Sequence, residues 1–98
     1  MSYEDKTAED GRLVILKELA LQVDGRLNEV SLQRVLETFA ITRSRDWVRT
    51  QLRKLAELEA IRITEAGTVM IAEIRTLGRN HVERRERIEG VTRPSDHA

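Results

Sequence analysis

The first stretch of regular hydrophobic pattern runs from residue 12 to residue 23. Its apolar residues return every three to four positions, the period of an α-helix: Ile15, Leu16, Leu19, Ala20 and Val23. Further apolar residues widen this surface, so we expect the helix to bury two faces. Thr7 followed by Asp10 resembles a capping box and predicts a helix start near residue 7, after a frayed polar leader, residues 1–6. Asp24-Gly25 predicts its end.

The next segment predicts a second helix with a third close behind it. Arg26-Leu27 can form a very short strand, and Asn28 or Ser31 can cap the second helix. The apolar residues of this helix fall on one face: Leu32, Val35, Leu36 and Phe39. Residues 40–42 are a short break before the third helix, for which Ser44 supplies a cap. Two helices joined in this way form a helix-turn-helix.

The third helix has an apolar side and a polar side. At about 100 degrees per residue, Val48, Leu52 and Leu55 fall together. Trp47 lies at the boundary, where a lone Trp more often packs partly buried than stacks on a ligand. The other side is polar and mostly basic: Asp46, Arg49, Thr50, Arg53 and Lys54.

The remainder predicts a hairpin, a fourth helix and a tail. Residues 60–64 and 69–74 are strand-like, and Glu65-Ala66-Gly67-Thr68 supplies a turn between them. Residues 76–88 form a charged helix with few apolar positions. The polar tail, residues 91–98, is expected to be loose unless a partner orders it.

The order helix, helix, helix, hairpin, helix is that of a winged helix-turn-helix, mainly α with a β-hairpin. We therefore predict a single winged-helix domain over residues 1–90, followed by the tail. The length of 98 residues agrees, because such a chain can bury one modest core but not two.

The amino-acid composition limits the cellular compartment and the kinds of reactive site that we expect. The chain has no Cys, which removes disulfides, thiol nucleophiles and thiolate metal sites. Its longest apolar runs, such as Leu13–Leu16, are far below the ~20 residues that cross a bilayer. The acidic N-terminus is unlike a signal peptide. We expect a cytoplasmic protein without membrane contact.

The distribution of charge along the chain, and not the net charge, makes DNA the leading candidate partner. The 17 basic and 17 acidic residues cancel, so no global field draws the protein onto nucleic acid. Residues 43–54, however, carry five basic side chains against one acidic. Arginine there can bond phosphate or guanine, and a threonine can touch a thymine methyl group. The side chains predicted to contact DNA are Arg43, Ser44, Arg45, Arg49, Thr50, Arg53 and Lys54, with Arg62 on the hairpin.

Two observations argue against this interpretation. The same arginines can be an ordinary solvated helix face, tuned by neighbouring ion pairs. The tip of the predicted hairpin carries Glu65 and no basic residue, so it would meet a phosphate backbone poorly. DNA binding through this helix requires the arginines of residues 43–53 to project into solvent, and the hypothesis fails if they pack against their own protein.

Three stretches resemble a known family: residues 9–16 (EDGRLVIL), residues 44–52 (SRDWVRTQL) and residues 87–94 (RIEGVTRP). They are similar to the small winged-helix proteins of Mu-like phages and prophages, often labelled ArsR-like, which share a Ser-Arg-Asp-x-Val-Arg-Thr pattern at the start of the third helix. Members often have Gly where this chain has Glu59, and many have Arg in place of Trp47. The resemblance implies a winged helix.

We find no set of residues that indicates an enzyme. The sequence contains no phosphate-cradling glycine loop, no nucleophile with a plausible base, and no closely spaced His and carboxylate set. Metal sensing of the ArsR type is not expected either, because Cys is absent and the two histidines are His81 and His97. We predict no cofactor and no small-molecule ligand.

Two hypotheses remain. The first is a DNA-binding winged helix, a phage-type transcriptional regulator or DNA-handling accessory that dimerises through its first and fourth helices, because one module contacts few phosphates. The alternative is a protein–protein interaction module that presents Trp47, Leu13, Val14 and Leu21 to another protein and does not bind DNA. The neutral charge and the acidic hairpin tip favour the alternative.

Overall fold

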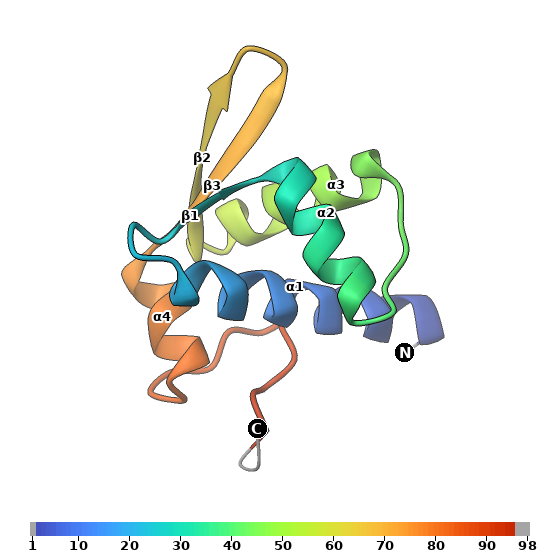
Figure 1. Cartoon of the computed structure of the whole chain (residues 1–98). Coiled ribbons are helices and arrows are strands. Elements are labelled where there is room, and N and C mark those ends of the chain that lie inside the picture. Colours follow the sequence, from blue (N-terminus) through green and yellow to red (C-terminus); the bar gives the residue numbers. More distant parts are fainter. Residues whose placement is uncertain (1, 96–98) are drawn as a thin grey trace.

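The computed structural model describes residues 2–95. Helices and strands follow one another in the order α1 (Tyr3–Leu21), β1 (Arg26–Asn28), α2 (Glu29–Thr38), α3 (Arg45–Glu57), β2 (Ile61–Ala66), β3 (Val69–Ile74) and α4 (Thr76–Val82) (Figure 1). The strands form one antiparallel sheet in the order β1-β3-β2. This mixed α/β arrangement is compatible with a winged helix. Within residues 2–95, no helix is both long and apolar enough to span a membrane.

Helix α1 begins earlier than the sequence predicts. The Ser2 hydroxyl accepts the Asp5 backbone N–H at 3.1 Å, and the Asp5 carboxylate accepts the Ser2 backbone N–H, which makes a capping box. Thr7 lies inside the helix, where its hydroxyl donates to the Tyr3 carbonyl. The predicted start near residue 7 is therefore wrong, because two overlapping sets of capping residues compete and the earlier one is used.

The core lies where α1 meets the other elements. Helix α1 runs beneath α2 and α3, with α4 at its C-terminal end (Figure 1). Its residues Ile15, Leu16 and Leu19 are fully buried, and neighbouring apolar residues pack against them from the sides. Val23 was expected on the buried stripe but is exposed, because it lies beyond the end of the helix at Leu21; Leu21, which the interaction hypothesis places on the surface, is exposed as well.

The two predicted helices and the turn between them are present, and of the two candidate caps for α2 the structure uses Asn28. The Asn28 side chain accepts the Ser31 N–H at 2.9 Å at the start of α2, and the Ser44 hydroxyl accepts the Trp47 N–H at 3.1 Å at the start of α3. Trp47 is partly buried against the core, as expected. A Cβ atom on Gly11 would lie 2.9 Å from the Trp47 ring, so a larger residue in α1 here would displace that ring.

The sheet confirms the short strand expected near Arg26 and the predicted hairpin. β1 pairs with β3 so that Arg26 lies opposite Glu73, and β2 pairs with β3 so that Arg62 lies opposite the same residue. Met70, Ala72 and Ile74 of β3 point into the core. By strand alternation, Arg26, Glu73 and Arg62 share the outer face.

The segment after α4 differs most from expectation. Helix α4 ends at Val82, not near residue 88, and the chain turns back toward α1, where Ile88, Val91 and Pro94 are buried. His81 fixes this return: its Nδ1 accepts the Ile88 N–H at 3.0 Å, and its Nε2 lies 2.9 Å from the Thr92 carbonyl oxygen. The expectation of a loose tail is wrong for residues 91–95, because burial of their apolar residues outweighs the polar composition.

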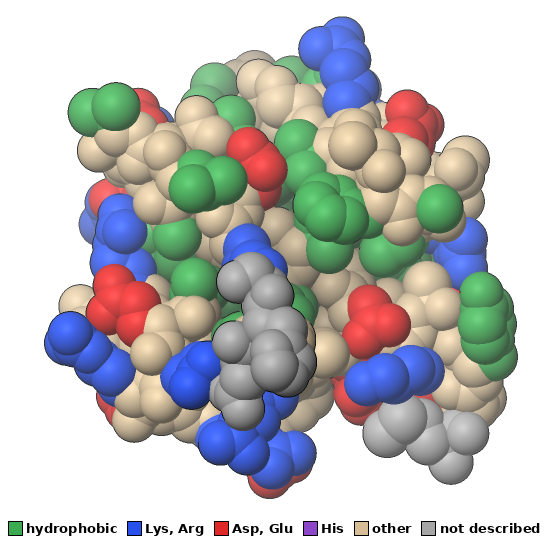
Figure 2. Space-filling view, turned by 60° about the horizontal axis from the view of Figure 1, so that its bottom comes forward, with side chains coloured by type: hydrophobic (Ala, Val, Ile, Leu, Met, Phe, Trp, Pro, Cys, Tyr) green, Lys and Arg blue, Asp and Glu red, His purple; other side chains and the backbone are tan. Residues whose placement is uncertain are grey.

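The returning segment covers part of α1. The Arg12 guanidinium donates to the Gly90 carbonyl at 2.6 Å, and the Thr92 N–H donates to the Glu9 carbonyl at 3.2 Å. Viewed from this underside, Figure 2 shows hydrophobic side chains in separate patches between charged ones. The chain itself thus covers part of α1, one of the two helices expected to form the dimer contact. Residues 96–98, including His97, lie outside the described residues.

Glu59 has a backbone conformation that favours glycine. Its φ is +63°, and the Ala60 N–H donates to the Leu55 carbonyl at 2.9 Å to close the end of α3. We expect Glu59→Gly to stabilise the fold by about 0.5–1 kcal/mol, the left-handed strain less the added chain entropy. Urea unfolding measures this. Glu59→Ala is the control, because it keeps the Cβ; equal stability of the Gly and Ala variants would contradict the argument.

Candidate functional site

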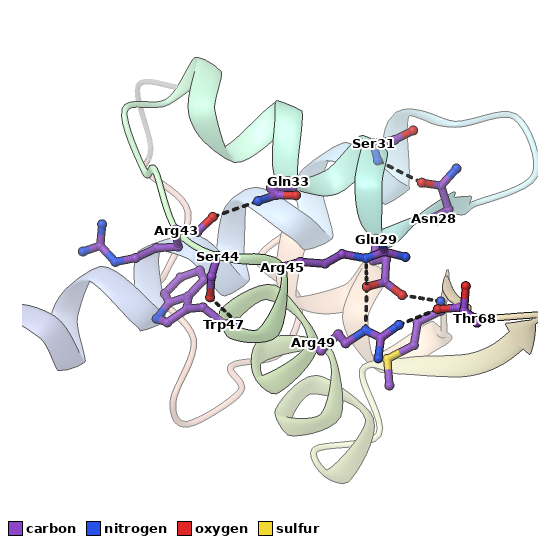
Figure 3. A network of polar contacts seen from close by, with 11 residues as sticks. Asn28, Glu29, Ser31, Gln33, Arg43, Ser44, Arg45, Trp47, Arg49 and Thr68 are labelled. Carbon is purple, nitrogen blue, oxygen red and sulfur yellow. Dashed lines mark hydrogen bonds and ion pairs between the residues drawn. The ribbon is translucent and has the colours of Figure 1, made fainter.

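The most constrained polar cluster lies between α2, α3 and the hairpin. Asn28 caps α2, so Glu29 is its first residue, and the side chain of Glu29 points toward α3 (Figure 3). One carboxylate oxygen accepts from Nε of Arg45 at 2.7 Å and from Nε of Arg49 at 2.6 Å. The other oxygen accepts the backbone N–H of Met70 in β3. One side chain therefore joins three elements.

Glu29 is an ionised carboxylate at neutral pH although its side chain has 0% exposure. Burial alone raises the pKa of a carboxyl group, but the hydrogen bonds from Arg49, Arg45 and the Met70 N–H outweigh burial and lower the pKa to about 2. Two guanidinium groups face this single negative charge. The cluster thus keeps one net positive charge.

Arg49 links α3 to the hairpin turn. Besides its bond to Glu29, its Nη2 donates to the carbonyl of Thr68. The Arg49 side chain is 27% exposed and that of Arg45 is 42% exposed. Both arginines are anchored inward, yet both reach the surface.

Arg43 takes no part in the Glu29 cluster and interacts with α1 and Trp47 instead. Its guanidinium pairs with Glu4 of α1 at 3.0 Å and lies over the Trp47 ring, 5.7 Å from the centroid. The hydrogen bond from Arg43 also lowers the pKa of Glu4. Gln33 donates to the Arg43 carbonyl at 2.9 Å and holds the turn in place (Figure 3). Arg43 therefore joins α1 to the turn before α3, and its charge is balanced there.

The other predicted contact residues have different environments. Arg53 and Lys54 are exposed and make no ion pair with the described residues. Thr50 is exposed as well, with its hydroxyl donating to the Asp46 carbonyl at 3.1 Å. Arg62 pairs with Glu73 at 2.9 Å at the base of the hairpin, next to α4 and away from the turn.

The arginines of residues 43–53 are divided. Arg43 packs against its own protein through Glu4, so the expectation is wrong there. Arg45 and Arg49 bond to Glu29 yet stay 42% and 27% exposed, and Arg53 is exposed, so the condition set for DNA binding is met by Arg53 and only in part by Arg45 and Arg49. Glu29, which organises the cluster, was missed. A signal for it exists, because Glu29, Leu32 and Leu36 fall at i, i+3 and i+7 and so share the buried face of α2.

Within residues 2–95, no group of three or more metal-binding side chains lies close together. His81 uses both ring nitrogens to hold the segment after α4.

Comparison with known proteins places the chain among phage proteins. No protein-family model matches it, and no solved structure does. A protein of Escherichia phage Mu, described as the uncharacterized protein gp26, is 34% identical over 94 residues, which cover 96% of this chain and 97% of the phage protein. The similarity confirms the relationship to Mu-like phages and carries no ArsR-like label.

Replacement of Glu29 by Gln tests whether the shared carboxylate stabilises the fold. Glu29→Gln keeps the size and an acceptor for the Met70 N–H but leaves Arg45 and Arg49 without their counter-charge. We expect unfolding in urea to show a loss of about 1–3 kcal/mol. Glu73→Gln, which breaks the exposed pair with Arg62, should cost less than about 1 kcal/mol. Equal losses would show that the buried Glu29 carboxylate stabilises the fold no more than an exposed ion pair does.

The same group predicts a specific acid sensitivity. Because the pKa of Glu29 is lowered from 4.5 to about 2, its contribution is complete above pH 4.5 and is lost as the pH falls toward 2. Stability should fall by up to about 1.4 kcal/mol per pH unit from this group within that window. Urea unfolding of the wild type and of Glu29→Gln at several pH values isolates the effect. The two curves should converge at low pH; parallel curves would rule out the assignment.

Proposed function

The chain belongs to the family of phage Mu protein gp26, and we propose that it is a non-enzymatic winged-helix protein that binds duplex DNA through α3. It would serve as a phage-type transcriptional regulator or DNA-handling accessory. The observation that carries the proposal is a row of three arginines on α3, two of them oriented by the buried Glu29.

The topology supports a winged helix. A short strand between α1 and α2, two helices joined by a turn, and a hairpin that pairs with the short strand are arranged around α3 as in that fold (Figure 1). In DNA-binding proteins with a helix-turn-helix, the second of these helices enters the major groove.

Arg45, Arg49 and Arg53 recur every four residues, so they lie along one side of α3, about 6 Å apart along its axis. The hydrogen bond of Arg45 to the described residues uses Nε alone, which leaves its terminal nitrogens available. A guanidinium held in place before binding loses less entropy when it meets a phosphate. The Glu29 contacts therefore reduce the charge of this row but also orient it.

The charge of one copy is modest, so we propose that two copies bind together. Glu29 offsets one of the three arginines, and Glu65 lies near the hairpin tip. Two linked modules gain affinity without new contacts. The returning segment covers the N-terminal half of α1, whereas Leu21 and Val23 are exposed at 77% and 107% at its other end, near α4. We place the proposed homodimer contact at that end.

The second candidate is a protein-interaction module without DNA binding. It is favoured by the exposed Tyr3 (84%) and Phe39 (59%) and by the internal use of Arg43. Of the four residues expected to form this surface, Leu21 is exposed at 77%, whereas Leu13, Val14 and Trp47 are partly buried against the core.

Binding to a fluorescent duplex, followed by anisotropy over a salt series, separates the two candidates. We expect log affinity to fall with log salt by about 0.9 per neutralised phosphate. Arg53→Gln with Lys54→Gln should weaken binding on all sequences and reduce the slope by about one for each phosphate that is no longer neutralised. Folding should be unaffected, because both side chains are exposed.

The matched control is Arg85→Gln with Arg87→Gln, which removes two exposed cations beyond α4. It should leave the affinity and slope nearly unchanged. Absence of salt-dependent binding, or equal effects of the two double variants, would reject DNA binding through α3 and leave the interaction module.

A further inference from the structure

A second basic site lies at the base of the hairpin, on the outer face of the sheet. It is a hollow of about 460 Å³, the size range of pockets that hold small molecules. Three of the six lining residues are arginines and one is acidic. The lining consists of Arg62, Glu73, Ile74, Arg75, Thr76 and Arg79.

Close backbone packing gives the hollow a fixed shape. Gly78 of α4 lies so near the end of α3 that an added Cβ would be 2.4 Å from the Ala60 carbonyl oxygen. The Arg79 guanidinium rests against Gly25, where an added Cβ would lie 3.0 Å from Nη2. Gly25 also has a φ of +69°. A larger residue at position 25 would therefore displace Arg79, and one at position 78 would displace α4, the helix that carries Arg79.

The charge in the hollow is unbalanced. Arg62 pairs with Glu73 at 2.9 Å, whereas Arg75 and Arg79 make no ion pair with the described residues. Arg79 is partly buried and Arg75 is exposed. Three arginines and one carboxylate line the hollow, so it keeps an excess of two positive charges after Glu73 offsets Arg62.

We infer that this hollow binds a phosphate group. Guanidinium groups present paired N–H donors that match the oxygens of phosphate, and the Thr76 hydroxyl on the rim is a further donor. Arg62 alternates with Ile61 and Ile63, which pack on the core, so it points away from α3. The site is therefore separate from the α3 row, and its phosphate belongs to a free phosphate compound or to a nucleic-acid segment other than the one at α3.

The test is a titration of the whole protein with inorganic phosphate, followed by amide NMR at constant ionic strength. We expect saturable shifts at Gly25, Arg75 and Arg79. Arg75→Gln with Arg79→Gln should weaken this binding about tenfold or more, while Arg85→Gln with Arg87→Gln should not. Unsaturable shifts, or equal weakening in both variants, would overturn the site. Arg75→Glu, at an exposed position, gives the same test if the double variant is unstable.

A parallel titration with duplex DNA identifies the source of the phosphate. If the duplex competes with phosphate at Arg75 and Arg79, the site exists and its ligand is a nucleic acid. If phosphate binding is unchanged in the presence of the duplex, the site exists and its ligand is a free phosphate compound. The inference is independent of DNA binding at α3, because Arg53→Gln with Lys54→Gln should leave the phosphate shifts intact. Loss of those shifts in that variant would overturn a separate site.

Discussion

A buried carboxylate must be matched by hydrogen bonds, and Glu29 is matched from three directions. Arg45 and Arg49 of α3 supply two donors and the Met70 N–H of β3 supplies the third. Since an unpaired charge in this position would be costly, the start of α2, the first turns of α3 and the hairpin keep one relative placement. The surface that α3 presents to solvent depends on this arrangement, and so do the directions in which its arginines point.

Local chemistry was enough to predict much of the fold. Asn28 and Ser44 cap the helices that the sequence assigned to them, and the hairpin and its short third strand lie where expected. The predictions were wrong where contacts between residues far apart in the sequence determine the local structure. Helix α4 stops at Val82 because the following residues gain more by packing on α1, with His81 as their anchor. The local sequence pattern of the segment after α4 does not indicate that it packs on α1.

The sequence predicted which residues form the candidate site but not the ion pairs that hold its arginines. The arginines of α3 are where the helical period puts them. Their partners Glu4 and Glu29, however, lie 39 residues from Arg43 and 16 residues from Arg45 in the sequence. Only the phase of α2 hints at Glu29, and no comparable signal marks Glu4. A count of basic residues therefore overstated the charge that α3 offers to a ligand.

The bond between Arg49 and the Thr68 carbonyl has a consequence for motion. Arg49 stabilises the hairpin turn with the same guanidinium that reaches the α3 surface, so an anion that competes for it also weakens the restraint on the hairpin. By thermodynamic linkage, a hairpin held in place by some other contact would in turn change how readily Arg49 accepts that anion. Under the proposed function, an anion bound at Arg49 would thus be coupled to the restraint on the hairpin through one side chain.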